Sequence, residues 1–454
     1  MSYLLNTPEN QKAMLDRIGA KSIEALFDNI PENVRLKRSL DLPPALSEME
    51  LEQHVHECNK QTTSVDEAVC FLGGGAYDHF IPAVVDAVAS RSEYYTAYTP
   101  YQAEASQGSL QAFFEYQTMI CQLTGMDVAN ASLYEGGSAV AEAVIMAMAI
   151  SPKRNKVLIA KSLHPEYRTV LRTYAANLDL HIEVLPTPNG FVNPDDLSKQ
   201  INDDTLCVIV QHPNFFGTFE EVNAISELCQ EKGALFVVSF DPISLGMLKK
   251  PGDYGADIAI GEGQCLGNPL VYGGPYLGLL ACRQEYVRKM PGRLVGETTD
   301  ERGKRCWVLT LQTREQHIRR EKATSNICTN QGLFALRSTV YLAALGPQGL
   351  KETADLCFRK AHYLADQLCE LPGVKMRFEG PFFNVSSFFK EFTVQVKTDV
   401  SKLLTGLAND GFLAGLGLKT WYSDLADCIT IAVTEKRTRQ EMDNLVDAWK
   451  KHST

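Results

Sequence analysis

A short glycine-rich segment stands directly before an apolar helical pattern and could bind a phosphate group. Gly136, Gly137 and Ser138 come first, and mostly apolar residues follow from 140 to 150. Free backbone N–H groups and a hydroxyl at the start of a helix favour an anion. The alternative is a plain glycine turn in which Ser138 caps the helix. Glu135, beside this segment, would repel a phosphate unless its carboxylate points away.

Two further polar side chains follow predicted strands, where a parallel sheet lines its cleft. His164 comes after the apolar run 157–160, and Asp241 comes after the run 235–238. The His164 ring could lie over a flat ligand, although a histidine before a proline is as often a loop cap. Asp241 could pair with the cationic ring nitrogen of a cofactor, or it could be a turn residue before a proline.

An aromatic run between residues 93 and 108 fits neither a helical nor a strand period. Tyr94, Tyr95, Tyr98 and Tyr101 fall close together, and their irregular spacing predicts a loop. Tyrosine is favoured both at subunit interfaces and in ligand-binding walls. Both roles therefore stay open.

A charged segment, 313–329, contains Arg320 and ends in small polar residues, Thr324, Ser325 and Asn326. A charge run is usually a solvated helix face. The hydroxyl-bearing end is what makes this segment a candidate for ligand contact.

The segment from Pro251 to Arg288 has the order strand, glycine-rich loop, strand, and it contains no lysine. This layout resembles the part of aminotransferase-like pyridoxal-phosphate enzymes, fold type I, in which a lysine holds the cofactor as a Schiff base. Cys265 stands near the place of that lysine. The resemblance implies a pyridoxal-phosphate fold without its covalent anchor. We therefore expect no catalytic residue on this chain alone and a dependence on a partner.

The elements that must position these residues follow an α/β pattern. Short apolar strands alternate with helical patterns, which predicts a mostly parallel sheet, seven-stranded in the class it resembles, covered on both faces. The expected strands are 157–160, 206–210, 235–238, 258–260 and 277–280, and the expected helices are 138–150, 167–176 and 221–231. We expect an N-terminal helical arm over 1–60, this large domain over 61–330 and a smaller C-terminal α/β domain over 331–454. In the last, helices are expected at 332–345, 351–371, 400–408 and 439–450, and strands at 389–396 and 428–433.

Several long motifs closely resemble the P-protein of the glycine cleavage system, and the likeness runs along essentially the whole chain. They are TAYTPYQAEASQG (96–108), ANASLYEG (129–136), MPGRLVGET (290–298) and REQHIRREKATSNICTN (314–330). The length is similar to that of subunit 1, the amino-terminal half in the split form of this family. In the family the cofactor lysine of subunit 2 stands in a His-Lys-Thr setting, and this setting falls on Gln264, Cys265 and Leu266 here.

The resemblance implies a reaction, a cofactor and partners. Together with subunit 2, a glycine dehydrogenase (aminomethyl-transferring) would decarboxylate glycine on pyridoxal phosphate, release CO2 and transfer the aminomethyl group to the lipoyl arm of H-protein. The cofactor is expected on a lysine of subunit 2, in an assembly with two copies of each chain. The residues implied to reach the partner's site are Thr324, Ser325, Asn326, Arg320, Tyr94, Tyr95 and Tyr98. The residues of this chain's own cofactor site, or of a vestige of one, are Gly136, Gly137, Ser138, His164 and Asp241.

Two alternatives stand beside this interpretation. The chain could be a catalytically inert pseudo-enzyme subunit that only stabilises a pyridoxal-phosphate partner. A free-standing enzyme similar to cysteine desulfurases, using Cys328, would need an anchoring lysine that the segment before it lacks.

Composition argues against several other classes. The net charge of −11 disfavours a nucleic-acid or anionic membrane surface. The 12 cysteines are scattered singly, without the spacing of zinc ligands, so we expect reduced thiols and no metal site. With no leader and no apolar run of roughly 18 residues, we expect a cytoplasmic protein.

Overall fold

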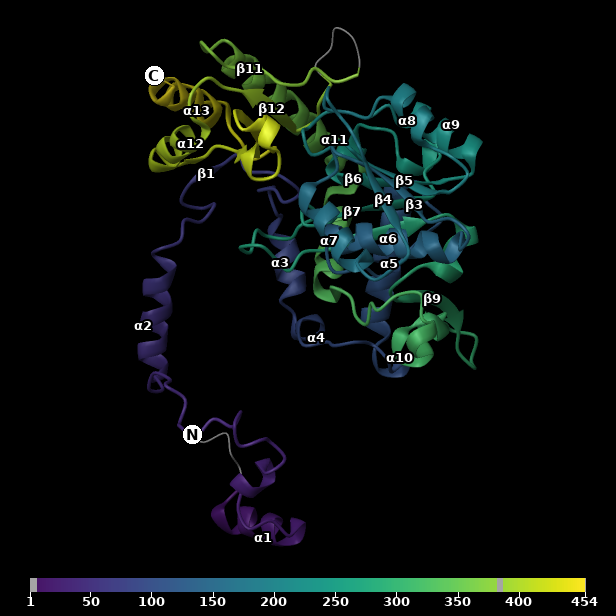
Figure 1. Ribbon diagram of the computed structural model, residues 1–454, viewed down its shortest axis with the longest axis vertical. Coiled ribbons are helices and arrows are strands. Elements are labelled where there is room, and N and C mark those ends of the chain that lie inside the picture. Colours follow the sequence, from purple (N-terminus) through teal and green to yellow (C-terminus); the bar gives the residue numbers. More distant parts are fainter. Residues whose placement is uncertain (1–5, 382–386, 454) are drawn as a thin grey trace. The chain divides into compact units, whose positions relative to one another are not determined.

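The computed structural model describes residues 6–381 and 387–453, and its contacts divide the chain into two compact units, Met1–Thr63 and Ser64–Thr454 (Figure 1). The first unit contains α1 (Pro8–Ile18), the 3-10 turn η1 (Glu24–Phe27) and α2 (Glu48–Asn59). Thr7 caps α1, and Ser47 caps α2 in a capping box with Glu50. None of residues 6–63 is buried, so this helical arm has no core of its own.

The second unit is built on a seven-stranded sheet. Its strand order is β2 (Val128–Ala129), β8 (Gly278–Cys282), β7 (Ile258–Glu262), β6 (Leu235–Phe240), β5 (Thr205–His212), β3 (Lys156–Ala160) and β4 (His181–Leu185). The five strands from β7 to β4 are parallel, whereas β8 runs antiparallel to both of its neighbours. The carboxyl ends of the parallel strands therefore meet at one edge of the sheet.

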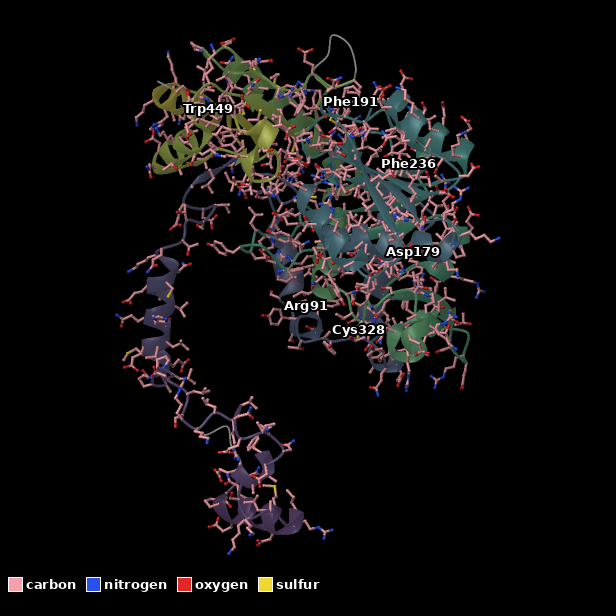
Figure 2. The ribbon with its side chains drawn as sticks, viewed as in Figure 1. Arg91, Asp179, Phe191, Phe236, Cys328 and Trp449 are labelled. Atoms are coloured by element: carbon pink, nitrogen blue, oxygen red, sulfur yellow. The ribbon has the colours of Figure 1, made fainter. Side chains whose placement is uncertain are left out.

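Both faces of this sheet are covered by helices, which explains why its strands read as continuous apolar runs. Val157 and Ile159 face a cluster with α6 (Gly136–Ile150) and α7 (Pro165–Ala175). Leu158 and Phe236 (Figure 2) face a second cluster with α8 (Pro194–Gln200) and α9 (Val222–Lys232). Beside that second cluster, a third one joins the sheet to α5 (Gln107–Thr124) and α11 (Gly332–Cys369).

A second, four-stranded antiparallel sheet follows in the C-terminal part of the chain. Its order is β11 (Lys375–Met376), β12 (Glu391–Gln395), β15 (Cys428–Ala432) and β14 (Leu416–Gly417). The later part of α11, α12 (Val400–Asn409) and α13 (Arg439–His452) pack against it, with Trp449 fully buried (Figure 2). The first part of α11 ends at Gly346, where a φ of 62° breaks the helix.

Short elements complete the unit. They are β1 (Val69–Cys70), which pairs with β13 (Phe412–Leu413), the hairpin of β9 (Leu294–Thr299) and β10 (Arg305–Thr310), and the helices α3 (Ala83–Ala89), α4 (Ser92–Tyr95) and α10 (Gln316–Arg319). No helix in the described ranges is long and apolar enough to cross a membrane.

The predicted fold class is confirmed, and the expected strands and helices are present within about two residues at their ends, except that the helix expected from 351 begins directly after the break at Gly346. The prediction of a continuous loop over the aromatic run is wrong at its start, because Tyr94 and Tyr95 lie in the single turn of α4. The sequence analysis missed α5, the β9–β10 hairpin and β4, an edge strand in which only Leu185 is fully buried. The domain boundaries near residues 60 and 330 stay predictions.

Candidate functional site

The glycine-rich segment does open a helix, but carboxyl groups of the chain itself occupy its first turn. α6 begins at Gly136, and its cap is Glu135, so the alternative in which Ser138 caps the helix is wrong. Glu135 Oε1 accepts the N–H of Ser138 at 2.8 Å and its hydroxyl at 2.5 Å. Glu262 Oε2, at the end of β7, accepts the N–H of Gly136 at 2.9 Å. The N–H groups of Gly136 and Ser138 and the Ser138 hydroxyl, which could hold an anion, are therefore paired with carboxyl oxygens.

Glu262 is held in the loop between β7 and β8 that the sequence marked as lysine-free. Its other oxygen accepts the N–H groups of Gln264 and Leu277, both at 2.9 Å. Burial is the main influence on this carboxyl and raises its pKa to about 7, against the opposing effect of these backbone donors. Cys265 is 2% exposed and lies in the same loop. The expected order of strand, loop and strand is present.

His164 caps α7 and packs against a ring from its own helix. Its Nδ1 accepts the N–H of Glu166 at 3.2 Å, and its Nε2 lies 2.7 Å from the carbonyl oxygen of Gly74. Nε2 must therefore carry the proton, and burial lowers the pKa of His164 to about 4. The Tyr167 ring stacks on the imidazole at 4.2 Å between centroids and 15° between planes. The capping role is present, and the Tyr167 ring covers one face of the imidazole.

Asp241 follows β6, and its two carboxylate oxygens have different partners. Its Oδ1 accepts the N–H of Ile243 at 3.0 Å, which is the turn that the sequence allowed. Its Oδ2 lies 2.8 Å from Nζ of Lys390, a lysine with a side chain only 1% exposed. Burial is the largest influence on the Lys390 amine and acts to lower its pKa, but Asp241, Cys265 and Cys357 together outweigh it, and the pKa is raised overall. This buried ion pair joins the large sheet to the start of β12.

Lys390 has further partners that the sequence analysis missed. Its Nζ lies 3.5 Å from the centroid of the Tyr77 ring and 3.1 Å from Nε2 of His79. His79 Nδ1 in turn lies 2.6 Å from the carboxylate of Glu435. The available signal was a lysine directly after Phe388 and Phe389 at the start of an apolar strand, since a cation at a buried position requires a partner.

A potential metal-ligand group lies beside this network, although the sequence spacing indicated none. Within the described residues, ligand atoms of His79, Cys357 and Glu435 lie within 4.8 Å of one another. Glu435 already accepts from His79, from the Cys357 thiol at 3.5 Å and from the N–H of Phe80 at 2.7 Å. Lys390 supplies a positive charge next to His79, which disfavours a cation there.

The ends of β5, β6 and β7 enclose a small cavity of about 30 Å³ at this edge of the sheet. Its lining includes Tyr77, Tyr167, Asp241, Glu262, Lys390 and Glu391. A cavity of this size admits only a few water molecules. The cavity thus brings Asp241 together with Tyr167, which stacks on His164, and with Glu262, which accepts from Gly136. This is the grouping expected of a cofactor site, but little space remains between these side chains.

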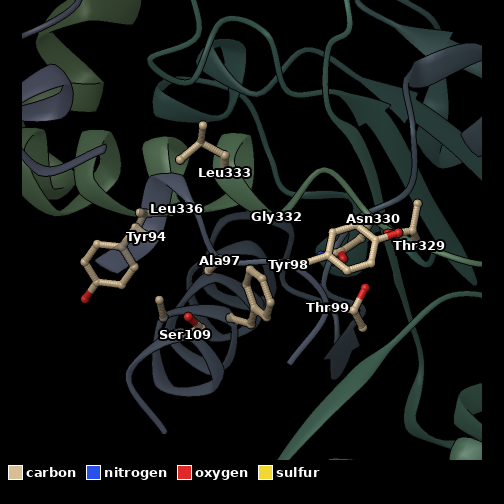
Figure 3. Close-up of a pocket in the computed structure, with 12 residues that line it drawn as sticks. Tyr94, Ala97, Tyr98, Thr99, Ser109, Thr329, Asn330, Gly332, Leu333 and Leu336 are labelled. Atoms are coloured by element: carbon tan, nitrogen blue, oxygen red, sulfur yellow. The ribbon is translucent and has the colours of Figure 1, made fainter. Parts of the chain in front are cut away.

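The second group of predicted residues surrounds a different cavity. A cavity of about 110 Å³ is lined by Tyr94 and Tyr98 from the aromatic run and by Thr329 and Asn330 from the end of the charged segment (Figure 3). In Figure 3 the Tyr98 ring points toward the side where Thr329 and Asn330 lie. Tyr98 is 86% exposed and Tyr95 is 67% exposed. These rings present a large apolar surface to solvent.

Arg293 holds this second group together and was missed as a site residue. It is 3% exposed, and its guanidinium donates to the carbonyl oxygen of Cys328 at 2.5 Å and to the Tyr101 hydroxyl at 3.0 Å. It also lies 5.4 Å from the centre of the Tyr101 ring. The motif MPGRLVGET contains this arginine, but its burial could not be read from the motif.

The residues Thr324 and Ser325 line neither of these two cavities but a third, very small one, together with Arg314. Ser325 Oγ accepts the N–H of Ile327 at 3.0 Å, and the hydroxyl also donates to the buried carboxyl of Glu142, which acts to lower the pKa of that carboxyl. Asn326 and Arg320 are exposed. The Thr324–Asn326 segment therefore belongs to the surface near α6, away from the Asp241 pocket.

Comparisons with known proteins place this geometry in context. A family model described as "Glycine cleavage system P-protein" matches residues 1–449. A protein named "Probable glycine dehydrogenase (decarboxylating) subunit 1" from Carboxydothermus hydrogenoformans is 53% identical over 447 residues, which cover 98% of this chain and 99% of that protein. The protein of the same name from Moorella thermoacetica is 49% identical over 450 residues, 99% of each chain.

Solved structures agree with the fold. The structure of a glycine decarboxylase (P-protein) of the glycine cleavage system, in inhibitor-bound form, is 42% identical, has a TM-score of 0.88 and covers 99% of this chain and 100% of its own. The sphingosine-1-phosphate lyase of Burkholderia pseudomallei is 15% identical with a TM-score of 0.66, over 93% of this chain and 94% of its own. At that identity the likeness concerns the fold alone.

Proposed function

The chain belongs to the glycine cleavage system P-protein family, and we propose that it works as subunit 1 of a two-chain glycine dehydrogenase (decarboxylating). With subunit 2 it would decarboxylate glycine, release CO2 and pass the aminomethyl group to the lipoyl arm of H-protein. The observation that carries this proposal is the identity of about half of all residues, over nearly the full length, to proteins named as subunit 1.

The proposal places pyridoxal phosphate on a lysine of subunit 2. Its support is the β7–β8 loop, which contains no lysine and in which Gln264, Cys265 and Leu266 align, on the family's pattern, with the setting of the anchoring lysine. When bound, this cofactor supplies an electron sink for the loss of CO2. An assembly of two copies of each chain and a cytoplasmic location belong to the same proposal, and all twelve cysteines of this chain are free, in keeping with a reducing compartment.

The residues of this chain would act on the partner's site from the exposed face around Tyr98. Tyr94, Tyr95 and Tyr98 would exclude water and shape the path of the lipoyl arm. Thr324, Ser325, Asn326 and Arg320 would bind the phosphate of the cofactor or the carboxylate of glycine. The contacts of Arg293 support a role of this face in the partner's site, because they connect Tyr101 of the aromatic run to Cys328 at the end of the charged segment.

A scaffold role is the second candidate, and one observation favours it. The Ser325 hydroxyl is engaged with Ile327 and Glu142 of its own chain, so it has less freedom to bind a ligand of the partner. In that case the chain would only stabilise subunit 2.

Alanine substitutions of Thr324 and Ser325 in the assembled enzyme separate the two candidates. Each lost hydrogen bond to a charged group would be worth roughly 1.5–3 kcal/mol, so pyridoxal phosphate should dissociate at least about tenfold faster. Cofactor retention is measured by gel filtration and absorbance, and activity by exchange of labelled CO2 into glycine. Ser401→Ala, on the exposed face of α12, is the matched control.

Unchanged retention and exchange in both variants, with assembly intact, would favour the scaffold. The isolated chain should carry out no exchange by itself. If it did so without subunit 2, the division of labour between the chains would be wrong.

A further inference from the structure

The cofactor-like pocket of this chain differs from a binding site in a specific way. Three contacts would be needed there: a carboxylate for a ring nitrogen, a flat ring to cover the cofactor and N–H groups for a phosphate. Asp241, His164 and the first turn of α6 supply these three. In this structure each of them is already engaged by another side chain of the same chain.

The Asp241 carboxylate is already paired with a positive charge, the ammonium of Lys390, where a cofactor would place its protonated ring nitrogen. Nζ of Lys390 lies 2.8 Å from Oδ2 of Asp241, and the ammonium takes the place that a protonated ring nitrogen would need. The Tyr77 ring and His79 hold the amine from other sides, at 3.5 Å and 3.1 Å. Withdrawing Lys390 would leave the Asp241 carboxylate buried and unpaired, which is strongly unfavourable.

The ring position and the phosphate position are filled as well. The Tyr167 ring stacks on His164. The Tyr167 hydroxyl also fills the space beside the glycine turn, since a Cβ built on Gly136 would lie 2.5 Å from that oxygen. Carboxyl oxygens of Glu135 and Glu262 accept the N–H groups of Ser138 and Gly136 that a phosphate would use. A phosphate would meet these two acidic groups at short range.

From these contacts we infer that Lys390, Tyr167, Glu135 and Glu262 form a built-in substitute for pyridoxal phosphate in this chain. The ammonium replaces the ring nitrogen, the tyrosine ring replaces the cofactor ring, and the carboxyl oxygens replace those of the phosphate. The residues therefore do not fit the cofactor, and the pocket is a polar core that ties the start of β12 to the large sheet. This inference concerns the chain's own pocket and does not depend on the proposed function.

Binding is the first test, and it uses the full-length chain with pyridoxine 5′-phosphate, which has no aldehyde and so cannot react with surface lysines. Titration calorimetry of the wild-type chain should show no saturable binding at millimolar ligand. Saturable binding of one ligand per chain, lost in Asp241→Ala, would overturn the inference. A decarboxylation defect in the assembled enzyme would leave this result untouched, so the two proposals fail separately.

Thermal unfolding is the second test, and it addresses Lys390 directly. Lys390→Met should lower the unfolding midpoint by about 4–6 °C, because it strands the Asp241 carboxylate. The double variant Lys390→Met with Asp241→Asn should recover at least half of this loss, because both charges are removed together. Lys397→Met, at an exposed position just after β12, is the matched control and should change the midpoint little.

If Lys390→Met behaves like the control, Lys390 does not occupy the pocket and the inference is wrong. The Asp241→Asn single variant is measured alongside, and the same conclusion follows if the double variant shows only the sum of the losses of the two single variants. If the single variant fails to fold while the double variant folds, the coupling that the inference requires is demonstrated.

Discussion

Replacement of Glu142 by glutamine should make the protein less sensitive to pH, because this carboxyl is buried in α6. Glu142 is 1% exposed, and its Oε2 has no hydrogen-bond partner within the described residues. Burial raises the pKa of Glu142 from its ordinary 4.5 to about 7, while the Ser325 hydroxyl acts in the opposite direction. The folded protein thus holds this proton more tightly than the unfolded chain.

The sign of the effect follows from that difference. The stability that the raised pKa contributes is fully present below pH 4.5, and it is lost as the pH rises through about 7. A pKa change of this size corresponds to roughly 3 kcal/mol, at about 1.4 kcal/mol per pH unit. Glutamine resembles the protonated carboxyl and does not titrate. Relative to wild type, Glu142→Gln should therefore gain stability as the pH is raised.

Thermal unfolding of wild type and Glu142→Gln at about pH 5 and pH 8 measures this gain. The difference in midpoint between variant and wild type should be larger at pH 8 by about 3 °C for a unit of this size. Glu220, Glu262 and Glu391 are also buried, with pKa values raised to about 7. The difference between the two proteins isolates Glu142, because these three titrate in both.

A matched control is Glu227→Gln, which makes the same change on the exposed face of α9 and should follow the wild-type profile. If Glu142→Gln and wild type instead show parallel midpoints from pH 5 to pH 8, Glu142 does not titrate in the neutral range. The argument from burial would then be refuted.

Two further predictions concern the exposed face and the arm. Arg293→Ala should destabilise the larger unit by roughly 2–4 kcal/mol, because it removes charged hydrogen bonds to Cys328 and Tyr101. Limited proteolysis should then cut the 94–101 segment faster. A cleavage rate equal to that of wild type would show that Arg293 does not hold this segment. The described residues of the arm, 6–63, are not buried. Removal of residues 1–63 should therefore leave the unfolding midpoint of 64–454 within about 2 °C of that of the full chain, but weaken assembly with subunit 2 in sedimentation. A large fall in the midpoint would mean that the arm stabilises its own chain.

The sequence predicted the α/β architecture because buried parallel strands and amphipathic helices leave local, periodic patterns. The strands at 157–160 and 235–238 could be placed for this reason. Elements with weaker patterns were missed, such as β4, whose side chains are exposed or half-buried except for Leu185. Candidate residues at strand ends were also found, because the topology of a parallel sheet brings His164, Asp241 and the start of α6 to one edge.

The sequence by itself determined the family, the fold class and the absence of a lysine between β7 and β8, since these depend on which residues occur in which order. Only the tertiary structure decided what fills the pocket. Lys390 reaches Asp241 from the position directly before β12, and Glu262 reaches the first turn of α6 from the end of β7. A buried charge is stable only beside a partner, and that partner is chosen by the packing of segments far apart in the chain, about which no local pattern carries information.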